Sequence, residues 1–129
     1  MRIWDSQTNR WTGSIYIVAS DGSASAVRLT YCKDKTDDNP TWSADSTTLF
    51  FISNRSGKRQ IHYISINHGE SCQLTAVPVD VASMRLSPSG TAICFQCEVN
   101  NEMLNIYRLS WFRFFLLIVM MCSAKQLKC

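Results

Sequence analysis

The sequence has little net charge of either sign. It carries 13 Lys and Arg residues against 10 Asp and Glu residues, a formal charge of only +3 over 129 residues. A surface that follows a nucleic-acid backbone needs a clustered excess of basic side chains. The charge balance therefore predicts that nucleic acid is not a partner.

The first residues of the sequence also lack the apolar core of a secretory signal. Residues 1–16, MRIWDSQTNRWTGSIY, contain no uninterrupted apolar stretch of the kind that forms a secretory signal, because residues 5–10 are polar or charged. By default this predicts a cytoplasmic location. The cysteines lack the regular spacing of a disulfide scaffold, and we expect free thiols at all six: Cys32, Cys72, Cys94, Cys97, Cys122 and Cys129.

What is present is an internal repeat. SIYIVASDGSASAVRLT (14–30) aligns with QIHYISINHGESCQLT (60–75), so that Ile15 corresponds to Ile61 and Leu29 to Leu74. WSADSTTLFF (42–51) aligns with LSPSGTAICF (86–95), 44 residues later, and NIYRLS (105–110) begins a third copy. A period near 45 residues, built of short strands and turns, is typical of the four-stranded blades of a β-propeller.

The repeat predicts an all-β fold, a partial β-propeller of about two four-stranded antiparallel blades. One complete blade should have strands at 40–43, 49–54, 60–66 and 72–75. Residues 15–20 and 27–30 would end a preceding blade, and 84–87, 92–97 and 105–110 would begin the next. The propeller would occupy residues 1–110 (blade parts 14–30, 40–75 and 84–110). Because closed propellers need four to eight blades, the flanking edges should be open to self-association.

The turns and strands of this repeat carry a family resemblance. The patterns W-S-x-D-x-x-x-L-x-F (42–51), S-N-R-S-G (53–57), Q-I-x-x-I (60–64) and Q-L-T (73–75) resemble the TolB-type propeller repeat. Residues 73–99 resemble the N-terminal propeller of dipeptidyl-peptidase V-like and acylaminoacyl-peptidase-like members of the prolyl oligopeptidase family. The resemblance covers roughly residues 10–110, and it departs where Ala44, Ser46 and Ser89 replace the family's Pro, Gly and Asp.

The resemblance implies a non-catalytic role for this chain. In that family the propeller is a substrate-filtering cap over a separate α/β-hydrolase domain with a Ser-Asp-His triad. The nucleophilic serine of that domain needs a G-x-S-x-G elbow between a strand and a helix. The nearest string, residues 69–73 (GESCQ), lacks the second glycine. A peptide substrate would then be bound only by the full-length parent protein.

A second class of function stays open, a TolB-like or WD-repeat-like module for protein–protein interaction. Trp4-Asp5 favours it, because a Trp-Asp pair closes the blades of WD repeats. Further coding sequence with a hydrolase elbow would favour the peptidase, and further blades alone would favour the module.

Other polar groups in the sequence favour structural roles. Cys94 and Cys97 have C-x-x-C spacing, but an odd separation on a strand places them on opposite faces. His62 and His68 have no companion ligands at metal spacing, and the loop with Asp34, Asp37, Asp38 and Asn39 lacks the glycine and glutamate of a calcium site. The glycosylation sequon at residues 54–56 suits a turn. Glu98 and Glu102 are expected at the solvated rim of a blade. We expect a solvated connector in the aspartate loop and no catalytic, cofactor-binding or metal residue.

Residues 111–129 leave the repeat pattern. The apolar run in SWFRFFLLIVMMCSAKQLKC (110–129) would span only about 18 Å as a helix from 111 to 122, against roughly 30 Å of hydrocarbon. Three interpretations compete: a membrane anchor at 111–122, a helix that covers the edge of the last blade, or sequence beyond a frame or exon boundary that does not belong to the fold. The abrupt end of the repeat favours the third.

Overall fold

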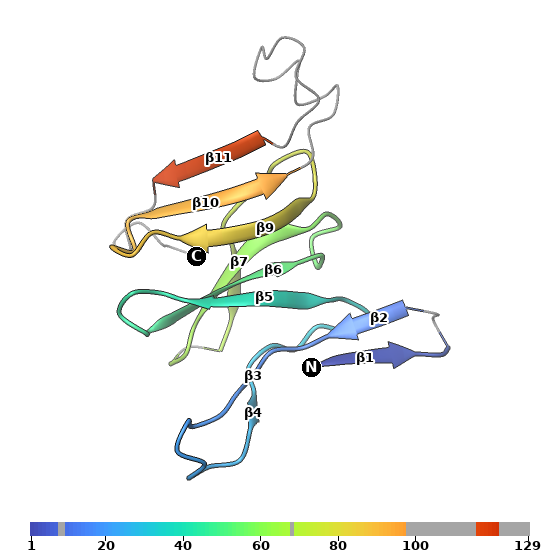
Figure 1. Ribbon diagram of the computed structural model, residues 1–129. Coiled ribbons are helices and arrows are strands. Elements are labelled where there is room, and N and C mark those ends of the chain that lie inside the picture. The colour runs from blue at the N-terminus through green and yellow to red at the C-terminus, as the bar shows by residue number, and fades with distance from the viewer. Residues whose placement is uncertain (8–9, 68, 98–115, 122–129) are drawn as a thin grey trace.

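The computed structural model describes residues 1–7, 10–67, 69–97 and 116–121, and every regular element in these ranges is a strand (Figure 1). No helix in this part of the chain is long and apolar enough to cross a membrane. The strands are β1 (Arg2–Asp5), β2 (Arg10–Gly13), β3 (Tyr16–Ile17), β4 (Val27–Arg28), β5 (Asp37–Trp42), β6 (Thr48–Ser53), β7 (Gln60–Ser65), β8 (Ser71–Gln73), β9 (Val81–Leu86), β10 (Ala92–Cys97) and β11 (Leu116–Met121).

The predicted complete blade is confirmed. Strands β5, β6, β7 and β8 form a four-stranded antiparallel sheet in sequence order. Its second strand is buried on both faces, because Leu49 and Phe51 face one side while Phe50 and Ile52 face the other. Burial on both faces is what a blade between two neighbours requires, and it explains the apolar run from Leu49 to Ile52.

The first strand of this blade, β5, is interrupted by a bulge. Its pairing with β6 shifts register between Asp38 and Thr41. Pro40 has no N–H to donate to a ladder, and Asn39 takes a left-handed backbone conformation with φ of 54°. The bulge separates the aspartates at the start of β5 from Trp42 at its end.

Several turns between the strands contain a residue in a left-handed backbone conformation. Gly57, in the hairpin after β6, has a φ of 100°. Ser46, where the family has glycine, has a φ of 57°, and Gly90 at the corresponding place in the next blade has a φ of 69°. Asp45 holds the first of these turns, accepting hydrogen bonds from Ser43 Oγ at 2.6 Å and from the Thr47 N–H at 3.1 Å. The bond from the Ser43 hydroxyl is the main cause that lowers the pKa of Asp45.

The second blade contains a strand that the sequence did not predict. β9 and β10 lie close to the expected positions, and β11 pairs with β10, giving the sheet order β11-β10-β9. The expected third strand at 105–110 lies outside the described residues. Residues 116–121 form a strand that covers the edge of β10. This observation corrects two expectations for these residues: that they lie outside the fold, and that they form a helix. A short apolar run suits a buried strand as well as a helix, so its pattern alone could not decide.

The N-terminal part forms two small sheets. β1 and β2 form a hairpin that the sequence analysis missed, with Trp4 opposite Trp11 and their rings edge to face at 5.2 Å. β3 and β4 pair with each other over two residues each, within the ranges 15–20 and 27–30 where strands were expected. Gly13 joins the hairpin to the start of β5, and a Cβ there would lie 3.0 Å from the Asp37 carbonyl oxygen. The close approach of the two backbones therefore requires glycine.

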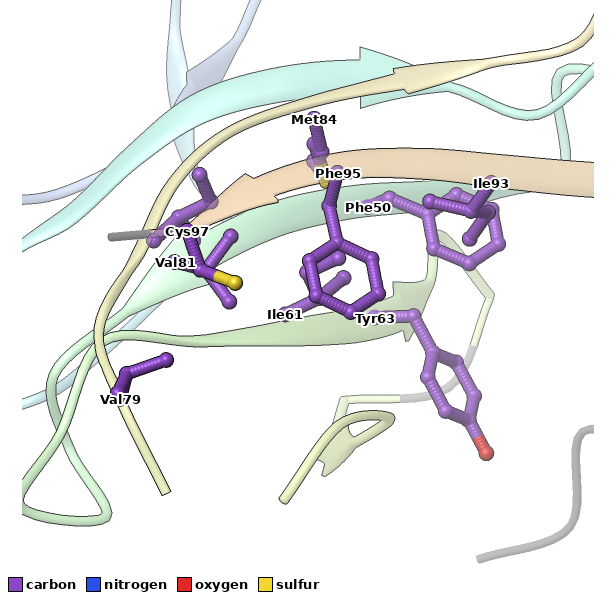
Figure 2. Packing of buried hydrophobic residues seen from close by; sticks show 10 residues of the cluster. Phe50, Ile61, Tyr63, Val79, Val81, Met84, Ile93, Phe95 and Cys97 are labelled. Carbon is purple, nitrogen blue, oxygen red and sulfur yellow. The ribbon is translucent and has the colours of Figure 1, made fainter. Parts of the chain in front are cut away.

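The main core lies between the two blades (Figure 2). One face of β6 and β7 packs against one face of β9 and β10, and Phe95, which is 1% exposed, lies at its centre among the side chains of Phe50, Ile61 and Tyr63. A smaller cluster on the other face of the first blade packs Leu49, Phe51 and Ile64 against Ile15. Each buried apolar side chain of this size contributes about 1.5–3 kcal/mol, so face-to-face packing of blades is the main source of stability.

Candidate functional site

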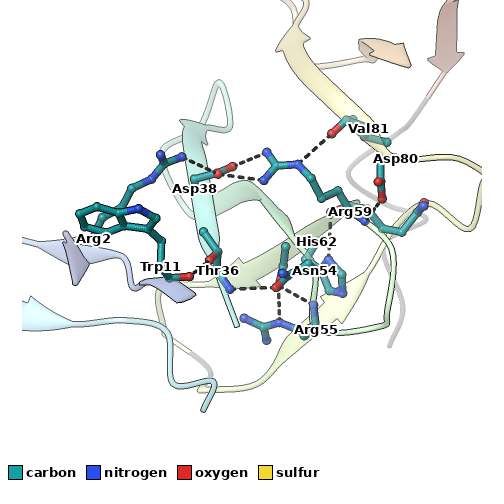
Figure 3. Close-up of polar contacts among 12 residues, drawn as sticks. Arg2, Trp11, Thr36, Asp38, Asn54, Arg55, Arg59, His62, Asp80 and Val81 are labelled. Carbon is teal, nitrogen blue, oxygen red and sulfur yellow. Dashed lines mark hydrogen bonds and ion pairs between the residues drawn. The ribbon is translucent and has the colours of Figure 1, made fainter. Parts of the chain in front are cut away.

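Asp38 is the centre of a polar network that spans the molecule (Figure 3). It accepts hydrogen bonds from Arg59 Nη2 at 2.9 Å and Nη1 at 3.1 Å, and from Arg2 Nη2 at 3.0 Å. Arg59 also reaches the second blade, since its Nε donates to the Val81 carbonyl at 3.3 Å and its backbone N–H donates to Asp80 Oδ1 at 2.6 Å. One carboxylate thus links the N-terminal hairpin, the first blade and the start of the second.

Asp37 forms a separate ion pair on the opposite side of β5. Its Oδ2 accepts a hydrogen bond from Arg55 Nη2 at 2.7 Å, and the Asp37 side chain is fully buried. Arg55 also donates to Ser53 Oγ and Ser71 Oγ, and its guanidinium lies over the Phe51 ring at 5.2 Å. Asp37 Oδ1 has no hydrogen-bond partner among the described residues. The pair is a fixed, desolvated contact of the kind that orients a turn.

These two ion pairs correct the expectation of a solvated connector. Asp34 is exposed, but Asp37 is buried and the Asp38 side chain is only 14% exposed. The sequence could not show this, because Arg55 and Arg59 are 18 and 21 residues away from their partners. Among the described residues no cluster of three or more His, Cys, Asp and Glu side chains could hold a metal ion.

His62 is a buried histidine of β7. It is 2% exposed, its ring stacks on Phe51 with centroids 5.9 Å apart, and Nδ1 lies 3.2 Å from the Gln60 carbonyl oxygen. Burial is the largest cause that lowers the pKa of His62, and the positive charge of Arg55 lowers it further. Both effects favour the neutral form of the ring. His68 lies outside the described residues.

Ser71, the serine in the string that comes nearest to a hydrolase motif, has a structural contact rather than a catalytic one. Ser71 begins β8, an outer edge strand, and its Oγ accepts a hydrogen bond from Arg55. A nucleophile needs a neighbouring base, and a guanidinium cannot act as one. The sequon at Asn54 is also part of a turn, because Asn54 Oδ1 accepts a hydrogen bond from the Thr36 N–H at 2.8 Å.

The cysteines differ from one another. Cys94 and Cys97 lie on opposite faces of β10, as their spacing predicted, and burial raises the pKa of the Cys97 thiol. Cys32 and Cys94 are free thiols. Cys72 takes part in a disulfide, which corrects the expectation of free thiols at that position. Cys122, Cys129, Glu98 and Glu102 lie outside the described residues.

A cleft opens between the N-terminal hairpin and the segment that joins β4 to β5. It has a volume of about 520 Å³, and its walls include Ile3 and Asp5 of the hairpin, Tyr16 of β3, and Arg28 of β4. Residues 31–34 complete it. The sequence analysis assigned no role to these residues, since they come together only when the hairpin packs beside β3.

The fold and these contacts define the class of the molecule, a partial β-propeller with one complete blade. No family model matches the chain. The protein named "Uncharacterized peptidase YuxL" from Bacillus subtilis (strain 168) is 34% identical over 88 residues, which cover 67% of this chain and 13% of that relative. This chain thus spans about an eighth of the length of the peptidase.

A solved structure shows the same fold. The structure of a protein assigned as TolB from Agrobacterium tumefaciens superposes with a TM-score of 0.59 at 27% sequence identity, over 65% of this chain and 30% of that one. The chain is therefore a propeller segment that is similar in sequence to part of a peptidase and similar in structure to part of a TolB protein.

Proposed function

We propose that this chain is part of the propeller domain of a serine peptidase of the prolyl oligopeptidase family. In this proposal the blades restrict the access of peptides to a separate catalytic domain, and the parent protein has dipeptidyl- or acylaminoacyl-peptidase activity. The 34% identity to a named peptidase over 88 residues is the observation that carries the proposal. The described blades themselves contribute no step of the hydrolysis.

The contacts of the described residues support a structural role for the groups that could otherwise do chemistry. Ser71 is bonded to Arg55, and His62 is buried against Phe51. The two residues belong to neighbouring strands of one sheet, β8 and β7, and neither occupies a turn between a strand and a helix. A hydrolytic serine would instead need an exposed turn between a strand and a helix, with a base beside its Oγ.

A chimera tests this function. The 88 matched residues of the Bacillus protein would be replaced by those of this chain, and hydrolysis of dipeptidyl and acylaminoacyl p-nitroanilides would be compared with hydrolysis of a long unfolded polypeptide. We expect the chimera to hydrolyse the short substrates as the unmodified Bacillus protein does, and to keep that protein's preference for them over the long polypeptide. A folded chimera without activity would contradict the equivalence of the two segments.

The chain alone provides the second half of the test. We expect no hydrolysis and no labelling by a fluorophosphonate probe, with the Ser71→Ala variant as the matched control. Labelling of the chain that disappears in Ser71→Ala would contradict the assignment of a non-catalytic segment.

A second candidate is a TolB-like module that binds other proteins, and the structural similarity to the Agrobacterium protein favours it. Blade edges such as β8 and β4 would then be places for self-association, because each has one side without a paired strand among the described residues. Sedimentation of the chain at increasing concentration tests this: a defined oligomer would favour the module, and a monomer at all concentrations would contradict association through the edges.

A further inference from the structure

Arg28 differs from the other half-buried arginines of the described residues. Arg55 and Arg59 each form an ion pair, with Asp37 at 2.7 Å and with Asp38 at 2.9 Å. For Arg28, no carboxylate of the described residues lies within 4.0 Å. A guanidinium that is partly removed from water and has no counter-charge is unfavourable unless an anion can reach it.

Neutral groups nevertheless hold the Arg28 side chain in one position. Its Nε donates to the Thr30 carbonyl at 2.9 Å, and its Nη2 donates to Ser14 Oγ at 2.6 Å. The guanidinium also lies over the Tyr31 ring, 4.9 Å from its centroid. These contacts use only part of the five N–H donors of the guanidinium and fix its plane, which is the pre-organisation that recognition of a carboxylate needs.

The fixed guanidinium lines the cleft of about 520 Å³ between the hairpin and the β4–β5 segment. Lys33 is a further cation of this cleft, and Asp5 and Asp34 are its anions. Tyr16 and Tyr31, which are 40% and 74% exposed, provide aromatic walls. The cleft thus combines a fixed cation with apolar surface, as small-ligand sites do.

We propose that this cleft binds a peptide ligand through a carboxylate that pairs with Arg28. A carboxylate carries a single negative charge and matches the planar guanidinium. Asp5 and Asp34 balance the charges of Arg28 and Lys33 in the same walls, and a nearly neutral cleft suits a ligand with one negative charge better than a phosphate dianion. The proposal is independent of the peptidase assignment, because it depends only on the contacts of Arg28 and on the cleft.

Binding of a small probe to the full chain tests the proposal. The probe is acetyl-Tyr-Ala with a free C-terminal carboxylate, and the comparison compounds are the same dipeptide with a C-terminal amide, and inorganic phosphate. Arginine Nε–H resonances in ¹H–¹⁵N NMR spectra report the contact. We expect a saturable shift of the Arg28 signal with the carboxylate, binding at least tenfold weaker for the amide, and binding of phosphate no tighter than that of the carboxylate.

Two variants separate a role of Arg28 from a general charge effect. Arg28→Gln should weaken binding at least tenfold, whereas Arg85→Gln, at an exposed position on β9 outside the cleft, should bind as the unmodified chain does. Equal binding of carboxylate and amide would overturn the proposal, and so would tighter binding of phosphate or unchanged binding in Arg28→Gln. If Arg28→Gln does not fold, the comparison of carboxylate with amide on the unmodified chain decides the question.

Discussion

Arg59 and Asp38 form a two-pronged contact in which both terminal nitrogens of the guanidinium donate to the two oxygens of the carboxylate, at 2.9 and 3.1 Å. The pair joins the hairpin turn before β7 to β5, the first strand of the same blade. Because Arg59 also binds the Val81 carbonyl and Asp80, the contact continues into the second blade. The two blades are therefore held together by polar contacts at one end and by the apolar core along their faces.

The partners of Asp38 should contribute unequally to stability. Arg59→Ala should lower the free energy of unfolding by about 1–3 kcal/mol, because it leaves a largely buried carboxylate with one partner fewer. Arg2→Ala should lower it by at most about 1 kcal/mol, since the Arg2 side chain is 63% exposed. Urea unfolding measures both, and a double-mutant cycle with Asp38→Ala isolates each pair. A cost for Arg2→Ala as large as that for Arg59→Ala would contradict this ranking.

Ser46 and Gly90 occupy corresponding turns, and exchanging serine and glycine should change the free energy of unfolding in opposite directions at the two positions. Ser46 has a φ of 57°, so Ser46→Gly should raise the free energy of unfolding by about 0.5–1 kcal/mol. Gly90 has a φ of 69°, and a Cβ there would lie 3.1 Å from the Ala44 Cβ, so Gly90→Ser should lower it by at least about 1 kcal/mol. Thermal unfolding of both variants checks this. Destabilisation by Ser46→Gly would show that the serine side chain contributes more than its backbone strain costs.

The strands of the complete blade could be predicted because their signals are local. Alternating apolar residues and turn residues placed four strands, and the observed β5 to β8 lie within about three residues of those positions. The bulge at Asn39 and the start of β5 at Asp37 were missed, because aspartate and proline are disfavoured in strands and only the partners of Asp37 and Asp38 make that position favourable.

The candidate site could not be predicted in the same way. Arg28 and Asp38 are ordinary surface residue types in the sequence, and their importance comes from groups brought to them by the fold, such as Ser14 and Arg2. The β1–β2 hairpin gave no period-2 signal, since Ile3, Trp4 and Trp11 are all at least 45% exposed. Neither face of the hairpin is buried strongly enough to leave a pattern in the sequence.

The core between the blades should depend strongly on Phe95. Its side chain is 1% exposed, and Phe95→Ala should lower the free energy of unfolding by about 3–5 kcal/mol, through lost burial and the cavity that remains. Val18→Ala is the matched control, because Val18 is 62% exposed and should change stability by no more than about 0.5 kcal/mol. Urea unfolding followed by circular dichroism measures both. A small effect of Phe95→Ala would mean that the two blades do not pack face to face in solution.

His62 should make stability depend on pH. Burial lowers the pKa of His62 below its ordinary value of 6.5, so the folded protein takes up a proton less readily than the unfolded chain. The contribution of the neutral ring is then complete above pH 6.5 and is lost progressively as the pH falls below that value. Thermal unfolding between pH 7.5 and 5.5 should show a midpoint temperature that falls as the pH is lowered. His62→Gln should remove most of this fall. The same dependence in His62→Gln, or its loss in His68→Gln, would assign the effect to another group.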